Sequence, residues 1–497
     1  MSAVQALSDA LSGGTTALLA VLLPLIGTLF IGLFRNRPNL REGATLATGV
    51  ILFGVVLSLW PDIMAGGRPH FILATPIPGI PLVLEVEPLG YLFSLVASSL
   101  WIVTSLYSIG YMRGHHEKNQ TRFYLFFAVA ISATMGVAFS GNLFTLFLFY
   151  EVLTLCTFPL VTHHQTEKAR KAGRVYLGIL LSTSVGLQLL AIIWTYSLAG
   201  TLDFRPGGIL DGHIATGLVP ILLALFVFGV GKAAVMPFHR WLPAAMVAPT
   251  PVSALLHAVA VVKAGVFTIL KVSVFIFGPA LISETGAADI LLWVAAATII
   301  LGSLVAFTKD NLKARLAYST ISQLSYIVLG ALLANEWGII GGGMHIVMHA
   351  FGKITLFFGA GAIMVAAHKT EISQMKGLGR TMPFTFGAFF IGALSIIGLP
   401  PAGGAWSKWF LGMGTLEAGQ LGLLAVLMVS SLLSLVYLLE VPLKAFFGKP
   451  EEPLEHEGIH EAPLPCLIAM GVTSLATIGL FIYPEPFYRL MELVVGY

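Results

Sequence analysis

Several charged side chains lie inside apolar stretches of the sequence, where a charge is costly. Lysine interrupts "FGVGKAAVM", "AVVKAGV", "AFGKITL" and "WSKWFL", and a glutamate interrupts "LFYEVLT". Ionisable residues within membrane segments are rare for this reason, and they mark ion pathways or proton relays. The first candidates for chemistry are therefore Lys232, Lys263, Lys353, Lys408 and Glu151.

Two histidines precede one of these lysines at helical spacing. His345, His349 and Lys353 stand at positions i, i+4 and i+8, so they share one face of a helix. Because imidazole titrates near physiological pH, this face predicts a proton relay. His257 lies six residues before Lys263, a spacing that does not stack the two side chains. We expect His257 either to conduct protons or to support its helix.

The glutamate needs a partner or a proton. A carboxyl group buried in apolar surroundings is either neutral or paired with a cation. Lys232 is the expected partner of Glu151, and a neutral Glu151 that is hydrogen-bonded within the bundle is the alternative. Lys271 lies near a helix end, from which its long side chain could reach the interface.

Other conspicuous residues favour ordinary roles. His115, His116, His163 and His164 lie at loop edges and are expected at the interface, and "EHEGIHE" (Glu455–Glu461) is expected to be a solvated acidic loop. Cys156 and Cys466 lie far apart in apolar runs and suggest neither a disulfide nor a metal site. No nucleotide or cofactor motif is found, so we expect no cofactor and no enzymatic activity in the chain itself.

The elements that must position these residues are membrane helices. The chain is 57% hydrophobic and only 10% charged, whereas soluble domains contain about 25% charged residues. This composition predicts an all-α polytopic membrane protein. The net charge of +3 is too small to suggest nucleic acid binding, and the N-terminus carries no basic region typical of a cleaved signal peptide.

Apolar runs long enough to cross a bilayer predict about 14 spans. Their approximate limits are 15–34, 44–64, 89–111, 122–140, 143–162, 175–198, 217–237, 251–280, 288–308, 319–334, 338–367, 384–416, 421–447 and 462–483. Nearly all loop Lys and Arg residues fall in odd-numbered loops, whereas the even-numbered loops hold only Arg68 and Arg205. The positive-inside rule therefore predicts that both termini lie outside the cell.

Two of these spans look broken at matching positions. Lys232 is followed by Pro237 in the seventh span, and Pro400 and Pro401 precede Lys408 in the twelfth. Each is the fourth helix of a five-helix block, and blocks offset by five helices are inverted relative to each other. Broken segments in inverted repeats are the best sequence indicator of a transport site. The expected units are 1–121 (helices 1–3), 122–280 (first repeat), 281–447 (second repeat) and 448–497 (cytoplasmic loop and helix 14).

The residues around the first break resemble a known family. "KAAVMPFHRWLPAAMVAPTPVSALLHAVAVVKAGVF" (Lys232–Phe267) is similar to the signature of the antiporter-like subunits shared by respiratory complex I and multisubunit Mrp-type cation/proton antiporters. The resemblance continues through "FTKDNLKARLAYSTISQLSYI" (Phe307–Ile327) and covers roughly spans 3–13. Within the family, the first stretch is most similar to the D subunits of Mrp antiporters. Complex I subunits with lysine at the span-5 acid, or glutamate at the span-12 lysine, fit less well.

The resemblance implies a fold of 14 helices with two inverted five-helix units, and it assigns roles to the charged residues. Glu151 would be the key acid and Lys232 its partner, Lys263, His345, His349 and Lys353 would form the central relay, and Lys408 would be the terminal lysine. The expected function is proton translocation within a Na⁺ or K⁺/H⁺ antiporter, beside other membrane subunits in a bacterial plasma membrane. The alternatives are a proton-pumping subunit of complex I or of a membrane-bound hydrogenase, and a partly structural subunit.

Overall fold

The computed structural model describes residues 13–450 and 458–496. Two expectations lie wholly or partly outside this range. They are the absence of a signal peptide, which concerns residues 1–12, and the solvated acidic loop, of which residues 455–457 are not described.

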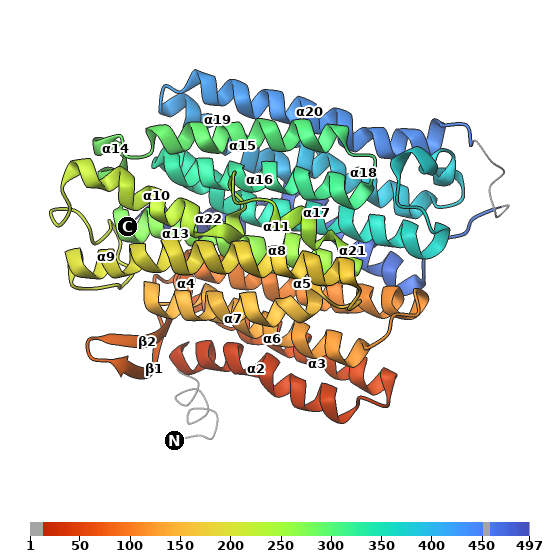
Figure 1. Ribbon diagram of the computed structural model, residues 1–497, viewed down its shortest axis with the longest axis horizontal. Coiled ribbons are helices and arrows are strands. Elements are labelled where there is room, and N and C mark those ends of the chain that lie inside the picture. Colours follow the sequence, from red (N-terminus) through yellow and green to blue (C-terminus); the bar gives the residue numbers. More distant parts are fainter. Residues whose placement is uncertain (1–12, 451–457, 497) are drawn as a thin grey trace.

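The long helices lie side by side in one bundle, with their axes roughly along the long axis of the molecule (Figure 1). The first part of the chain forms α2 (Gly13–Leu33), α3 (Pro38–Leu57), the short α4 (Trp60–Met64) and α5 (Pro88–Gly114). Between α4 and α5, strands β1 (His70–Ile77) and β2 (Ile80–Glu85) pair as an antiparallel hairpin.

The middle of the chain contains both regular and broken helices. The regular ones are α6 (Gln120–Ala138) and α7 (Leu143–Val161), and α8 (Glu167–Thr183) continues through the π-helical η1 (Ser184–Gln188) into α9 (Leu189–Ala199). The irregular part comprises η2 (Thr216–Leu218), α10 (Val219–Gly229), η3 (Gly231–Ala233), α11 (Trp241–Ala244), η4 (Ala245–Val247), α12 (Thr250–Ala254), the π-helical η5 (Leu255–Val259), α13 (Val261–Val272) and the π-helical η6 (Ser273–Phe277).

The last part of the chain surrounds one long helix. α17 (Glu336–Ala367) packs against α16 (Leu312–Leu333), α18 (Pro383–Ile397), α19 (Gly404–Glu417) and α21 (Leu464–Ile482). The remaining elements are α14 (Pro279–Thr285), α15 (Asp289–Thr308), η7 (Ile372–Met375), η8 (Leu378–Arg380), α20 (Leu421–Phe447) and α22 (Glu485–Val495).

The helices have the dimensions of membrane spans. Within residues 13–450 and 458–496, 12 helical segments are long and apolar enough to cross a bilayer, and Thr216–Gly229 and Pro383–Ile397 are shorter apolar helices. These two shorter helices belong to the spans that were predicted to be broken. Each predicted span thus has a helical counterpart, and the all-α polytopic fold is confirmed.

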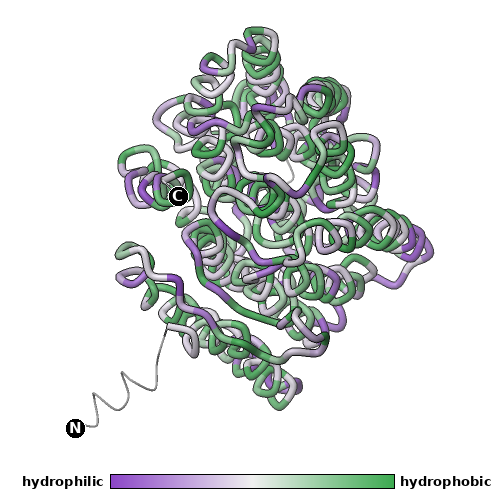
Figure 2. Tube along the Cα trace, turned by 90° about the vertical axis from the view of Figure 1, so that its left-hand side faces the viewer, coloured by the Kyte–Doolittle hydropathy of each residue, from purple (hydrophilic) through white to green (hydrophobic). Residues whose placement is uncertain are grey.

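The two ends of the bundle differ in their loops. We call the end that carries β1 and β2 the hairpin end, on the left of Figure 1, and the opposite end the basic end. Figure 2 views the bundle from the hairpin end and shows apolar helices, with hydrophilic segments mainly in the connections. At the basic end Arg41, Arg113 and Glu42 form a cluster of ion pairs that joins α3 to α5.

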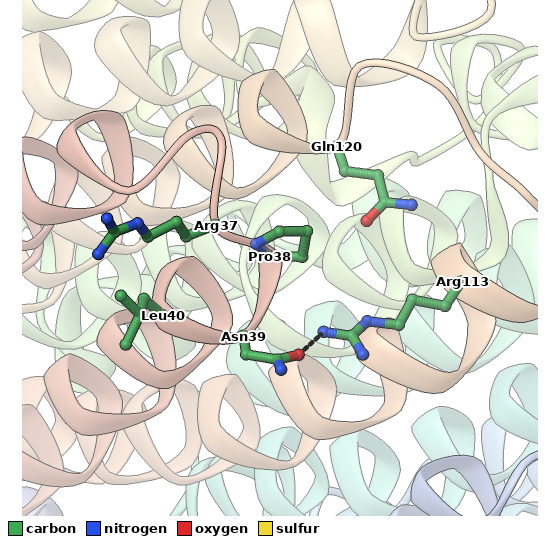
Figure 3. Close-up of a pocket in the computed structure, with 6 residues that line it drawn as sticks. All are labelled: Arg37, Pro38, Asn39, Leu40, Arg113 and Gln120. Atoms are coloured by element: carbon green, nitrogen blue, oxygen red, sulfur yellow. Dashed lines mark hydrogen bonds between the residues drawn. The ribbon is translucent and has the colours of Figure 1, made fainter.

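Figure 3 shows a surface pocket beside that cluster. It is lined by Arg37, Pro38, Asn39, Leu40, Arg113 and Gln120. Asn39 accepts a hydrogen bond of 2.6 Å from Arg113 at the pocket wall. The pocket lies between the start of α3, the end of α5 and the start of α6, and none of the buried lysines lines it.

Two elements of the fold were not predicted, the hairpin of β1 and β2 and the C-terminal helix α22. The eighth span is irregular, because π-helical turns interrupt it on both sides of α13. Such turns occur frequently at functional sites.

Candidate functional site

Lys232 lies where the seventh span breaks. α10 ends at Gly229, and the short η3 then places Lys232 fully inside the bundle. η3 can approach α13 closely because residue 265 is glycine, and a Cβ there would collide with the Lys232 backbone. The Lys232 Nζ donates to the Tyr150 carbonyl at 2.9 Å and to the Thr154 hydroxyl, and it lies 3.2 Å from the centre of the Tyr150 ring.

Glu151 is the residue next to this contact, yet it forms no ion pair with Lys232 among the described residues. The reason is helical geometry. Successive residues of an α-helix project about 100° apart, so when Tyr150 faces η3, Glu151 points aside. Its side chain is only partly buried, and its Oε1 has no hydrogen-bond partner. The expected pair between Glu151 and Lys232 is therefore not formed in this structure.

Lys263 and His349 meet at the centre of the bundle. Lys263 Nζ lies 2.7 Å from His349 Nδ1, and both side chains are fully buried. An ammonium group can donate to a neutral imidazole nitrogen, and a protonated imidazole can donate to a neutral amine. This contact therefore lets one proton be shared between α13 and α17.

His345 lies one turn from His349 on α17. We call Lys232, Lys263, His349, His345, Lys353 and Lys408 together the row. Its ring centre is 5.7 Å from that of His349, and its Nδ1 lies 2.8 Å from the Ser407 hydroxyl of α19. Its Nε2 lies 3.2 Å from Gln323 Oε1 on α16, and its ring stacks on Tyr326. Imidazole, amide and hydroxyl groups thus connect three helices.

Lys408 ends the row at the break of the twelfth span. α18 ends at Ile397, Gly398 turns the chain with a φ of 92°, and α19 resumes at Gly404. Lys408 Nζ donates to the freed Ile397 carbonyl at 3.1 Å and to Ser431 at 3.0 Å, and it lies 4.7 Å from the Tyr326 ring centre. Lys232 has the same three kinds of partner, a main-chain carbonyl, a hydroxyl and a tyrosine ring.

The Lys353 side chain has different partners from the two histidines on the same helix. Its Nζ donates to Ser319 Oγ at 2.8 Å, and Tyr437 donates to the same Ser319 oxygen at 3.0 Å. Tyr437 in turn lies 3.0 Å from the Ser434 hydroxyl. The row therefore forks at α17, with one branch toward Lys408 and the other into hydroxyl groups of α16 and α20.

The counter-charges of this row are few. Among the described residues, no carboxylate lies within ion-pair distance of Lys263, Lys353 or Lys408. Their partners are an imidazole, hydroxyls and main-chain carbonyls.

His257 is also fully buried, on the π-helical η5. Its ring contacts Phe357 at 4.6 Å, and neither ring nitrogen has a hydrogen-bond partner.

The expectation for Lys271 is wrong. Its side chain is fully buried and does not reach the interface. Its Nζ lies 3.1 Å from Glu87 Oε1 and donates to the Ser140 carbonyl at 2.8 Å. The ion pair was missed because Glu87 stands at the start of a span, where an acid usually faces water.

Of the four loop histidines at the basic end, only His163 is buried, whereas His116 and His164 are exposed and His115 is partly exposed. Glu117 lies 3.0 Å from His115 and 3.1 Å from His164. Burial favours a higher pKa for Glu117, but the hydrogen bonds and charges of His164 and His115 outweigh it and lower the pKa. The hydrogen bond to Glu117 raises the pKa of His164, against the opposing effect of burial.

Sequence reasoning missed the polar residues that hold the lysines. They are Tyr150, Thr154, Ser319, Gln323, Tyr326, Ser407 and Ser431. Their hydroxyl and amide groups are common in membrane helices and have no distinctive spacing. One usable signal was "STISQLSY" (Ser319–Tyr326), a polar run inside an otherwise apolar span.

Comparisons with known proteins identify the family of the chain. Residues 140–434 match the family model for "NADH:quinone oxidoreductase/Mrp antiporter, TM". The chain is 32% identical over 488 residues to NADH-quinone oxidoreductase subunit N of Desulforudis audaxviator, covering 94% of this chain and 96% of that protein. It is 30% identical over 490 residues to the A/B subunit of a probable K⁺/H⁺ antiporter of Rhizobium meliloti, covering 93% of this chain and 47% of that longer protein.

Two solved structures share the fold. One is the Mrp complex of Dietzia sp., with a TM-score of 0.83 and 22% identity, covering 96% of this chain and 97% of that chain. The other is a membrane-bound sulfane sulfur reductase, an archaeal respiratory membrane complex, with a TM-score of 0.84 and 24% identity, covering 97% of each chain. The expected resemblance is confirmed: the chain belongs to the NADH:quinone oxidoreductase/Mrp antiporter transmembrane family, as an antiporter-like membrane subunit.

Proposed function

We propose that the chain is the proton-translocating subunit of a multisubunit Na⁺ or K⁺/H⁺ antiporter of the Mrp type. The observation that carries the proposal is the buried contact between Lys263 and His349, with its continuation through His345 toward Lys408. Buried lysines without carboxylate partners destabilise a bundle, so a role in moving charge accounts for them better than packing.

The route begins at the first break. A proton enters near Glu151 and Lys232, where the α10 break and the Tyr150 carbonyl provide polar groups inside the bundle. It crosses the centre through Lys263 and His349, with His257 beside it on the π-helical turn. Protonation or rotation of Glu151 changes how firmly Lys232 holds its proton, and the change passes along the row by charge coupling.

The second half of the route ends at the second break. His345 passes the proton toward Lys408 through Ser407, and Lys353 holds a branch toward Ser319. Rotation of a ring or a hydroxyl, or a bridging water, closes the gaps between them. The similar surroundings of Lys232 and Lys408 support the proposal that 122–280 and 281–447 are inverted repeats.

The partners follow from the family. The relatives and the structural neighbours are subunits of multisubunit complexes, and we propose that this chain also assembles with other membrane subunits, in a bacterial plasma membrane with both termini outside. The K⁺/H⁺ antiporter relative supports a monovalent cation as the exchanged ion. We assign the Na⁺ or K⁺ path to the complex without placing it in a particular subunit.

A second function is favoured by another observation. A relative that matches over nearly the full length of both proteins is a subunit of an NADH-quinone oxidoreductase, whereas the antiporter relative is matched over only 47% of its own length. The same row would then pump protons in response to redox chemistry in other subunits. Purification of the native complex distinguishes the two, because small membrane subunits indicate the antiporter and iron–sulfur subunits indicate the redox enzyme.

The mechanism is tested by Glu151→Ala and Lys232→Ala in the assembled complex. Each change removes a charge at the proposed entry, and each is expected to abolish cation/proton exchange in everted vesicles, measured with a pH-sensitive dye. Asp289→Ala, at the start of α15 and away from the row, serves as the control and is expected to leave exchange intact. Normal exchange by assembled Glu151 and Lys232 variants would contradict the mechanism and favour a structural role.

A further inference from the structure

The buried Glu87–Lys271 pair is not used by the route described above. Both side chains are almost completely buried, at 3% and 0% exposure, and Lys271 Nζ lies 3.1 Å from Glu87 Oε1. The ring of Phe204 lies 4.5 Å from the same Nζ. A buried ion pair contributes little net stability, because desolvation offsets the attraction between its charges.

Helix capping does not explain the lysine. Glu87 precedes α5, and its two carboxylate oxygens accept hydrogen bonds from Leu89 N at 2.6 Å and Gly90 N at 2.7 Å. Ser, Thr, Asp or Asn at this position caps a helix without a charged partner from another helix. The contact with Lys271 of α13 is therefore an additional feature with its own cost.

Lys271 of the pair lies on the same helix as Lys263, the central lysine of the row. Lys263 and Lys271 stand at positions i and i+8 of α13, so they share one face, about 12 Å apart along the helix. Phe267 stands between them on that face, and its ring lies 5.3 Å from Lys271 Nζ. Phe267 also contacts Phe93 of α5. An aromatic layer thus separates Lys271 from the Lys263–His349 contact.

On its other side the pair leads to the hairpin end. Glu85 lies two residues before Glu87, at the end of β2, and its Oε1 is 3.5 Å from Arg68 Nη1. About a quarter of each of these two side chains is exposed, at 25% and 22%. Burial raises the pKa of Glu85, and the charges of Lys271 and Arg68 oppose this in part. The charge of Glu87 also raises the pKa, and that of His70 lowers it. Charged groups thus run from the buried Lys271 to the surface.

We infer that Glu87 and Lys271 form a proton-exchange site that connects Lys263 with the aqueous phase at the hairpin end. The inference rests on the proposed function of the row. In the exchange, an N–H bond of the Lys271 ammonium breaks and an O–H bond forms on Glu87, which leaves a neutral pair. Glu87 then releases the proton to water beside Glu85, and Lys271 regains one from the Lys263 side when Phe267 moves.

Lys271→Arg is the sharpest test. Arginine keeps the positive charge and the ion pair but does not deprotonate in proteins, so it preserves a structural contact and blocks exchange. In the reconstituted complex we expect this variant to assemble and to lose about 100-fold in exchange rate, a typical contribution of a proton-transfer group. The matched control is Lys444→Arg, in the partly exposed Lys444–Glu440 pair of α20, which should exchange normally. Wild-type exchange by assembled Lys271→Arg overturns the inference.

A second variant covers the case in which arginine is too large for the site. The double change Glu87→Gln/Lys271→Met replaces the ion pair by neutral groups of similar size, which a purely structural pair tolerates. Assembly with lost exchange supports the inference, and assembly with normal exchange overturns it. The variants of Glu151 and Lys232 separate the two proposals. If the Glu151 and Lys232 variants abolish exchange and the Glu87 and Lys271 variants do not, only the hairpin-end site is refuted. If the Glu151 and Lys232 variants exchange normally, the proposed function itself is refuted.

Discussion

At the scale of single residues, each lysine of the row is held by a short polar contact from a neighbouring helix. Lys232 contacts α7, Lys263 contacts α17, and Lys353 contacts α16. The partners are weak bases or hydroxyls, which can bind an amine in either protonation state. Such contacts position a proton carrier without fixing its charge.

Ser407→Ala tests this positioning. The change removes the hydroxyl that lies 2.8 Å from His345 Nδ1, so we expect cation/proton exchange to slow about tenfold, equivalent to the net value of one hydrogen bond. Dye-based exchange assays on the assembled complex measure the effect. Thr415→Val is the control, because its hydroxyl bonds the Gly412 carbonyl of the same helix α19. Equal rates for the wild type and Ser407→Ala would remove His345–Ser407 from the route.

The identity of the charged residues was predictable, but their partners were not. Lys232, Lys263, Lys353 and Lys408 stand out because apolar sequence surrounds them. Their contacts depend on how helices pack, and isolated hydroxyl groups such as that of Thr154 give no periodic signal. Lys271 was misassigned for the same reason, since its position near a helix end does not reveal a buried acid from the start of another span.

At the scale of elements, close backbone contacts hold the broken spans in place. The two parts of the twelfth span meet where Gly404 of α19 faces the Ser395 carbonyl of α18, and a Cβ at residue 404 would collide with that carbonyl. Proline and glycine residues predicted this break and that of the seventh span. The π-helical turns around α13 had no comparable sequence signal, because their hydrogen-bond shift depends on tertiary packing.

Gly404→Ala is therefore expected to destabilise the protein. Overpacking of this kind costs about 1–3 kcal/mol, and the shift would also move Lys408, four residues away. We expect a lower thermal unfolding temperature in detergent and reduced exchange. Gly412→Ala on the same helix is the control, because the nearest atom to its Cβ would be 3.6 Å away and alanine favours a helix. An unchanged unfolding temperature for Gly404→Ala would show that the break is flexible enough to adapt.

At the scale of the whole molecule, the ends of the bundle are tied by different kinds of contact. The hairpin end is closed by β1 and β2, which reach the loop before α7 through the bridge between Leu84 and Ser140. The basic end is held by ion pairs and histidines, including His164, which also contacts the Val247 carbonyl before α12. The number of spans and their order were predictable from hydropathy, but these end contacts join loops far apart in sequence and were not.

The histidine contacts make stability depend on pH at the basic end. The pKa of His164 is raised above its ordinary value of 6.5, so its contribution is present below about pH 6.5 and is lost as the pH rises through the folded-state value. The pKa of Glu117 is lowered below 4.5, so its contribution is present above that pH and is lost in stronger acid. Wild-type protein should exceed Glu117→Gln in thermal stability more at pH 5.5 than at pH 8.5. A difference that does not change with pH would show that Glu117 acts only through neutral hydrogen bonds.

The scarcity of carboxylates beside Lys263, Lys353 and Lys408 has a consequence for how many protons the row can carry. At an effective dielectric constant of about 20, two unit charges ~6 Å apart repel by about 3 kcal/mol. This spacing is close to the 5.7 Å between the rings of His345 and His349. A second proton on a neighbouring site is then disfavoured roughly a hundredfold. We therefore expect the row to carry one excess proton at a time. Each proton that enters then drives the release of the proton ahead of it, and the slowest release step limits the rate of cation/proton exchange.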